Sequence, residues 1–163
     1  MSSDTFPLLS ILIVWPLFGA ITTGFSGNKD SAKKIAAFFA VIELLGGLLA
    51  LHWFDPQQQG EQFQLLEQYD WIPSLNIHYM LGIDGISVLF LPMSAFVTLM
   101  ALVASWNSVK QMASFHYALL LALQGITIGV FTALDTVLFF LFWELTLPPI
   151  FFLIGLWGIG PQR

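Results

Sequence analysis

Two acidic residues lie within apolar stretches of this 163-residue chain. Glu144 lies in the apolar run 139–147, nine residues after Asp135, and Glu43 lies in the run 35–54. At 1.5 Å per helical residue, Glu144 is about 13–14 Å from Asp135, near the middle of a hydrocarbon layer about 30 Å thick. An acid at that depth is costly and usually functional, so Glu144 is the candidate catalytic residue for proton transfer.

Proton exchange is the chemistry available to such a carboxyl group. Burial favours its neutral, protonated form, and the approach of a cation or of water favours release of the proton. The alternative for Glu144 is structural, with a neutral carboxyl group bonding to a neighbouring helix. Glu43 is a secondary candidate, for which a structural interhelix hydrogen bond is the leading interpretation. Gly46 and Gly47 follow it and would let another helix approach closely.

Pro148 and Pro149 follow Glu144 within the predicted helix 136–157. Proline has no amide hydrogen, so the carbonyl groups of Glu144 and Leu145 lose their helical partners. The sequence therefore predicts a helix break, with a kink one turn after Glu144, which would open a polar spot beside the acid. The alternative is a proline kink with a packing role alone.

Three further residues are secondary candidates for proton transfer. Asp84 and Asp135 precede apolar helices, where capping of the helix N-terminus is the leading interpretation. His116 lies at the start of the fourth predicted span, which also contains Gln124, and a histidine near an interface can pass protons. No Cys is present, and no metal-binding or nucleotide-binding motif is found, so neither a metal site nor a cofactor site is predicted in this chain.

The composition indicates a membrane protein. Hydrophobic residues make up 57% of the chain and charged residues 9%, with a mean hydropathy of +0.81. These values exclude a water-soluble globule and a disordered tail, and 5 Lys and Arg against 10 Asp and Glu exclude a nucleic-acid partner. We expect one all-α membrane domain, 1–163, with about five transmembrane helices in the lipid bilayer. The predicted helices are 6–25, 35–54, 83–106, 115–133 and 136–157, with an outer polar connection over 55–79.

The positions of the basic residues predict the orientation. Lys29, Lys33 and Lys34 lie in the first predicted loop, Lys110 in the third, and Arg163 after the fifth span. Basic loops are cytoplasmic, so five crossings place the N-terminus outside and the C-terminus in the cytoplasm. The expected location is the cell inner (plasma) membrane, as a multi-pass protein.

Several segments resemble a known family. Residues 142–148 (FWELTLP) and 152–158 (FLIGLWG) resemble the fifth-helix signature of the antiporter-like subunits of respiratory complex I, the proton-translocating NADH-quinone oxidoreductase. Residues 71–73 (WIP) and 82–87 (GIDGIS) and the position of Asp135 support the match, which is closest to the chain M type. The resemblance covers nearly all of this chain but only the N-terminal portion of a family member.

This resemblance implies proton translocation coupled to electron transport. In the family the glutamate matching Glu144 pairs with a lysine on a later, broken helix. No Lys or Arg lies within the predicted spans, so the resemblance implies a partner chain that carries the missing helices and the lysine. It also implies other membrane subunits as partners. NADH, FMN, iron–sulfur clusters and quinone (ubiquinone) are expected in partner subunits, and this chain is expected to be a non-redox subunit of the translocase.

Two alternatives remain open. Related subunits of Mrp-type cation/proton antiporters and of membrane-bound hydrogenase modules share versions of these segments. The chain could also be a non-functional or purely structural fragment, a truncated product or one part of a split subunit.

Overall fold

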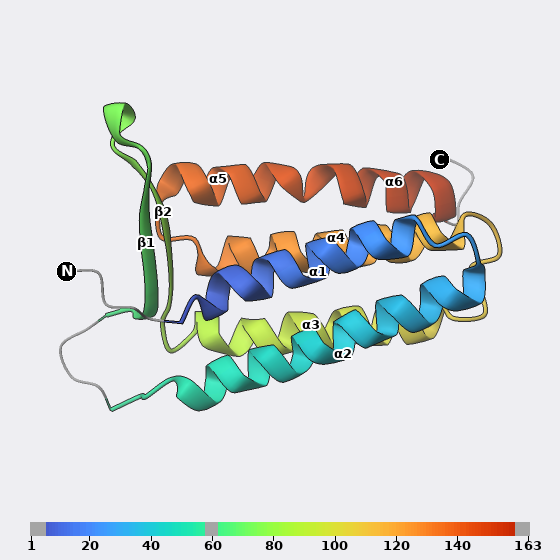
Figure 1. The fold of residues 1–163 in the computed structure, drawn as a ribbon, viewed down its shortest axis with the longest axis horizontal. Coiled ribbons are helices and arrows are strands. Elements are labelled where there is room, and N and C mark those ends of the chain that lie inside the picture. Colours follow the sequence, from blue (N-terminus) through green and yellow to red (C-terminus); the bar gives the residue numbers. More distant parts are fainter. Residues whose placement is uncertain (1–5, 58–61, 159–163) are drawn as a thin grey trace.

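The computed structural model describes residues 6–57 and 62–158. Antiparallel apolar helices form a bundle, and a two-stranded hairpin lies across one end of it (Figure 1). The helices are α1 (Leu8–Gly24), α2 (Lys29–Trp53), α3 (Ser87–Ser105), α4 (Ala113–Thr132), α5 (Thr136–Leu145) and α6 (Leu147–Trp157). The strands are β1 (Gln64–Ile72) and β2 (Ile77–Ile83), joined by a short 3-10 turn, Pro73–Leu75. Arg163 and residues 58–61 of the predicted polar connection lie outside the described residues.

Four helical runs in the described residues are long and apolar enough to cross a membrane. They are α2, α3, α4 and the combined run Thr136–Trp157, which contains α5 and α6. The fifth apolar helix, α1, has 17 residues and is therefore about 26 Å long. The predicted fold class, an all-α membrane protein, is confirmed, and the chain is a multi-pass membrane protein.

The hairpin lies where the sequence analysis expected only a polar connection. β1 and β2 pair antiparallel, and β2 extends to Ile83, the residue at which the third span was predicted to begin. The turn needs a left-handed residue, which Asn76 provides at φ 53°. The third span starts at Ser87 instead, after a turn in which the Asp84 carboxylate accepts hydrogen bonds from the N–H groups of Ile86 and Ser87.

Glu67 of β1 anchors the hairpin to α1. Its side chain is 3% exposed, and its carboxylate accepts hydrogen bonds from the backbone N–H groups of Leu9, at 2.7 Å, and Ser10. It also bonds the Ser10 hydroxyl, which lies 2.8 Å from the hydroxyl of Tyr79 on β2. Pro7 caps α1 without a side-chain hydrogen bond, so Glu67 supplies the missing anionic cap from a distant segment. Burial raises the pKa of the Tyr79 phenol.

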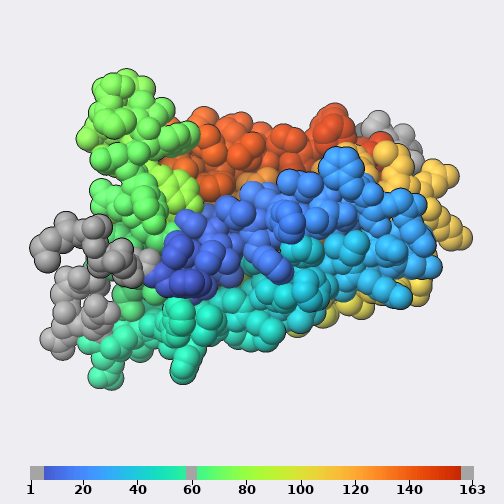
Figure 2. Space-filling model, in the orientation of Figure 1, coloured from blue at the N-terminus to red at the C-terminus, as the bar shows by residue number. Residues whose placement is uncertain are grey.

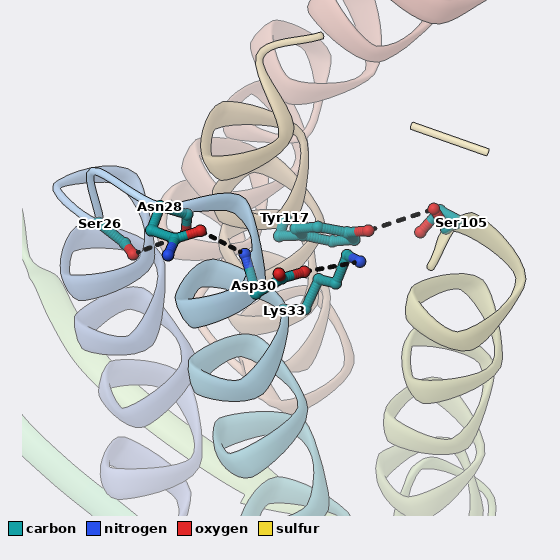
Figure 3. Close-up of polar contacts among 6 residues, drawn as sticks. All are labelled: Ser26, Asn28, Asp30, Lys33, Ser105 and Tyr117. Carbon is teal, nitrogen blue, oxygen red and sulfur yellow. Dashed lines mark hydrogen bonds and ion pairs between the residues drawn. The ribbon is translucent and has the colours of Figure 1, made fainter. Parts of the chain in front are cut away.

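The opposite end of the bundle holds a group of polar contacts around Lys33 (Figure 3). Asn28 caps α2 by accepting a hydrogen bond from the N–H of Asp30, and Asp30 pairs with Lys33 at 3.2 Å. Lys33 is only 8% exposed, and its ammonium group lies 5.6 Å from the ring centre of Trp106. Next to it Tyr117 of α4 donates to the carbonyl oxygen of Ser105 at the end of α3. The ion pair and the aromatic ring stabilise a cation held where the helices end.

Helix α4 lies at the centre of the packing, in contact with α1, α2, α3, α5 and α6. The run α5–α6 lies along one edge of the molecule (Figure 2) and is the least buried of the four long spans. Helices α2 and α3 approach closely at Gly47. A Cβ atom added there would lie 2.9 Å from the backbone nitrogen of Pro92 and 3.1 Å from the carbonyl carbon of Leu91.

We predict that Gly47→Ala destabilises the bundle by about 1–3 kcal/mol, because backbone atoms of α3 must move aside. Alanine is the better helix former, so a loss of stability must come from this contact. Gly155→Ala is the matched control, since a Cβ atom there meets nothing within 4 Å. Thermal unfolding in nanodiscs measures both variants. Equal melting temperatures for the two variants would contradict the close packing.

Candidate functional site

Glu144 lies on the exposed side of α5. Leu138 and Phe142 are buried on the side that faces α4, where the ring of Phe142 packs against Gly129. Glu144 follows Phe142 by two residues, which is about 200° around a helix, so its side chain points away from α4. Within the described residues its carboxylate makes no ion pair and no hydrogen bond. The face around it is apolar and exposed, with Phe140, Leu141, Trp143, Leu145, Leu147 and Phe151.

The helical run is interrupted just after Glu144. Helix α5 ends at Leu145, and α6 begins at Leu147 with Pro148 and Pro149 in its first turn. The N–H group of Thr146 donates to the carbonyl oxygen of Trp143 at 3.1 Å, and the Thr146 hydroxyl donates to the same oxygen at 2.7 Å. Helix α6 continues in nearly the same direction as α5 (Figure 1). The break is therefore local. It leaves the polar side chain and backbone of Thr146 two residues after Glu144.

Glu43 is buried inside the bundle. Its side chain is 1% exposed, and neither carboxyl oxygen has a hydrogen-bond partner among the described residues. Gln124 of α4 is also 1% exposed. Its amide nitrogen and oxygen likewise have no hydrogen-bond partner among the described residues. The sequence marked Glu43 as a secondary candidate but assigned no role to Gln124. The interhelix hydrogen bond suggested for Glu43 is not formed in the described structure.

Asp135 is the N-cap residue of α5, and Asp84 caps the start of α3 from two residues before its N-cap residue, Ile86. Asp84 accepts hydrogen bonds from the N–H groups of Ile86 and Ser87, and the Ser87 hydroxyl accepts one from the N–H of Asp84. Asp135 accepts from the first turn of α5 and, at 3.2 Å, from the N–H of His78 on the hairpin. Backbone donors lower the pKa of both carboxyl groups, with Ser87 as the main cause for Asp84 and Leu138 for Asp135.

His116 lies near the lysine-bearing end of the bundle. It is 9% exposed, and its Nδ1 has no hydrogen-bond partner among the described residues. Its ring packs edge-on against Trp157 of α6, with 4.8 Å between ring centres. It lines an open cavity of about 710 Å³ together with Ser105, Ser108 and Trp157.

The structure therefore does not gather the candidate residues into one site. Glu144 is on the outer face, Glu43 is in the interior, and the two aspartates lie at the hairpin end of the bundle. In the part of the chain that the structure describes, no group of three His, Asp or Glu side chains could hold a metal ion. Sequence reasoning missed Glu67, because an acid in a polar segment carries no local sign that it caps a helix 58 residues away.

Comparison with known proteins finds relatives along nearly the whole chain. F420H2 dehydrogenase subunit M of Methanosarcina mazei is 38% identical over 157 residues, covering 96% of this chain and 31% of the relative. NAD(P)H-quinone oxidoreductase chain 4 of Acaryochloris marina is 35% identical over 161 residues, covering 97% of this chain and 30% of the relative. A chain 4 protein of Thermosynechococcus vestitus is 38% identical over 160 residues, covering 97% of this chain and 30% of the relative. No family model matches the chain.

A solved structure shares the fold. A chain of the membrane-bound sulfane sulfur reductase, an archaeal respiratory membrane complex, matches with a TM-score of 0.72 at 24% identity. The match covers 92% of this chain and 23% of that one. This chain thus spans about a third of the length of the curated relatives it matches.

The two aspartate caps predict a pH dependence of stability. Because their pKa values are lowered below the ordinary 3.8, the caps stabilise the fold above that pH and lose this contribution as the pH falls further. Replacing both residues by asparagine keeps a capping oxygen but removes the titration. We expect the melting temperature of the double variant to fall less steeply below pH 3.8 than that of the unchanged chain. Parallel curves would show that the caps do not contribute to acid unfolding.

Proposed function

Because this chain is a homologue, over nearly its whole length, of subunit M and chain 4 of membrane oxidoreductases, we propose that it takes part in proton translocation. The complex is a NADH:quinone oxidoreductase of the plasma membrane, in which electron transport drives the translocation. This chain is a non-redox membrane subunit of it. NADH, FMN, iron–sulfur clusters and quinone are held by its partner subunits.

The position of Glu144 carries the proposal. The residue lies near mid-depth on the apolar run Thr136–Trp157, on the side opposite to α4. A carboxylate facing lipid at this depth costs several kcal/mol. Another protein segment must therefore cover it, and the exposed apolar side chains around Glu144 suit a packed helix. The Glu144 carboxyl group is costly to bury and points away from its own bundle. Function therefore explains its position better than the packing of this bundle does.

The partner supplies a lysine. The described spans hold no Lys or Arg at the depth of Glu144, and Lys33 lies at the end of the bundle, beside Asp30 and Trp106. A lysine on the segment that covers Glu144 favours the ionised form of this residue when it is close and the protonated form when it withdraws. Alternation between these states moves one proton at the carboxyl group. The break at Thr146 leaves polar backbone beside that group, where water can deliver the proton.

The chain is oriented with its lysines in the cytoplasm. The loops that carry Lys29 and Lys110 lie at the end of the bundle opposite the hairpin (Figure 1), and basic loops remain on the cytoplasmic side. Helix α1 begins at the hairpin end, so in this orientation the N-terminal side lies outside. The last helix, α6, ends at the lysine-bearing end.

Cysteine labelling tests this orientation, since the chain has no native Cys. Leu75→Cys, at the exposed tip of the hairpin, is expected to react with an impermeant maleimide in intact cells. Ser108→Cys, in the loop after α3, is expected to react only after the cells are permeabilised. The reversed pattern overturns the orientation.

Glu144→Gln tests the function. We expect the assembled complex to keep its electron transfer to quinone and to lose proton translocation through this subunit, by about tenfold or more. Proton uptake into vesicles, measured with a pH-sensitive dye, gives the readout. Asp70→Asn is the control, because this acid is 73% exposed on the hairpin, away from the apolar face. Unchanged translocation in an assembled Glu144→Gln complex means that the subunit is only structural.

A further inference from the structure

The buried core is divided by a polar layer. One apolar cluster lies toward the hairpin end and includes Leu12, Leu91 and Ile128. The other lies toward the lysine-bearing end and includes Ala40, Leu102 and Leu121. Along α2, Glu43 comes directly after the second cluster, and along α4 Gln124 lies between the two clusters.

Contacts between helices place Glu43 at a definite level of the bundle. Near one end of the α2–α3 pair, Gly47 meets the backbone of Pro92. Near the other end, Lys33 lies over the ring of Trp106. These helices run antiparallel, so each step back along α2 corresponds to a step forward along α3. Counting from either contact, Glu43 lies at the same depth as Phe96 of α3.

Contacts between α3 and α4 place Gln124 at almost the same level. Tyr117 bonds to the carbonyl oxygen of Ser105, and Phe131 stacks on Phe90 with ring centres 4.8 Å apart. These two contacts set Gln124 level with Val97 and the adjacent Thr98. Gln124 and Glu43 therefore differ in depth by about 2–3 Å, less than one helical turn.

No cation reaches this layer from the surrounding helices. Helices α1 and α3 carry no titratable side chain. On α2, Lys33 precedes Glu43 by ten residues and His52 follows it by nine, which is about 13–15 Å in each direction. On α4, His116 and Tyr117 precede Gln124 by seven or eight residues, about 10–12 Å. An ionised carboxylate would thus be buried without a counter-charge.

Space and further polar groups lie beside Gln124. A pocket of about 280 Å³ between α3 and α4 is lined by Gln124 together with the hydroxyl residues Ser94, Thr98 and Thr127. A buried water occupies about 30 Å³ and needs two to four polar partners. The amide of Gln124 and the neighbouring hydroxyl groups provide such partners at nearly the depth of Glu43.

We propose that Glu43 and Gln124 form an internal site that binds water and holds a proton on the Glu43 carboxyl group. The protonated carboxyl group donates a hydrogen bond to this water, and the amide of Gln124 holds the water from the other side. This arrangement gives a partner to one of the two carboxyl oxygens of Glu43 and to one of the two amide atoms of Gln124, all of which are unpartnered among the described residues. The site does not depend on the role proposed for Glu144, which points away from α4 on the other side of that helix.

Infrared spectroscopy of the full chain in nanodiscs tests the site. In a Glu144→Gln background, we expect a C=O stretching band of a protonated carboxyl group at neutral pH. Adding Glu43→Gln abolishes this band, and Glu43→Asp shifts it. Gln124→Leu keeps the band but moves it to higher frequency, because a hydrogen bond is lost. An O–H band of bound water, identified by its shift in H₂¹⁸O, disappears in both the Glu43→Gln and Gln124→Leu proteins.

Each contrary result rejects part or all of the site. Absence of the carboxyl band from the Glu144→Gln protein, or its survival in the Glu43→Gln double variant, shows that Glu43 holds no proton. An unmoved band in Gln124→Leu excludes Gln124 as part of the site. A water band that persists in both variants places the bound water elsewhere. Circular dichroism confirms that each variant keeps its helices.

Discussion

Hydrocarbon does not solvate charge, and this constraint decides where the ionisable side chains of the chain lie. Most of them are at the two ends of the bundle, where backbone groups or counter-charges meet them. Lys33 is the clearest case, because it is almost completely buried but lies beside Asp30 and over the ring of Trp106. The stem of such a lysine can pack against apolar side chains while its ammonium group stays with polar partners. The two glutamates at mid-depth depart from this pattern, and each needs an explanation of its own.

The same constraint governs the end of the bundle that the hairpin closes. Glu67 meets the N-terminus of α1, and Asp135 at the start of α5 accepts a hydrogen bond from the backbone of His78. Both acids meet unsatisfied N–H groups and the positive end of a helix dipole, which favour a carboxylate. The two contacts tie the hairpin to helices that are far apart in the sequence. They hold α1, whose own N-cap makes no side-chain hydrogen bond, against the longer spans.

Features that depend on local sequence could be predicted, and features that depend on distant partners could not. Hydrophobic length identified the membrane helices, and position at a helix start suggested the capping role of Asp84 and Asp135. The hairpin was missed because its strands carry polar and apolar side chains without a regular alternation, and its turn relies on a left-handed Asn76. Glu67 and Gln124 were missed as site residues for a related reason. The capping role of Glu67 and the depth that Gln124 shares with Glu43 follow from packing between helices and are absent from the residues around them.

The two mid-depth acids lie on opposite sides of α4 and meet different surroundings. The packing of Phe142 on Gly129 sets Glu144 level with Ile126 and Thr127 of α4, within about one turn of Gln124. One depth of the bundle therefore carries Glu43 facing inward, Gln124 on the central helix, and Glu144 facing outward. The inward acid is enclosed by helices of its own chain, which keep cations away from it and favour a held proton. The outward acid is open to whatever segment packs on α5 and α6, so a cation carried by that segment can reach it. The same residue type thus suits proton storage on one side of α4 and proton exchange on the other, and the difference comes from what covers each side chain.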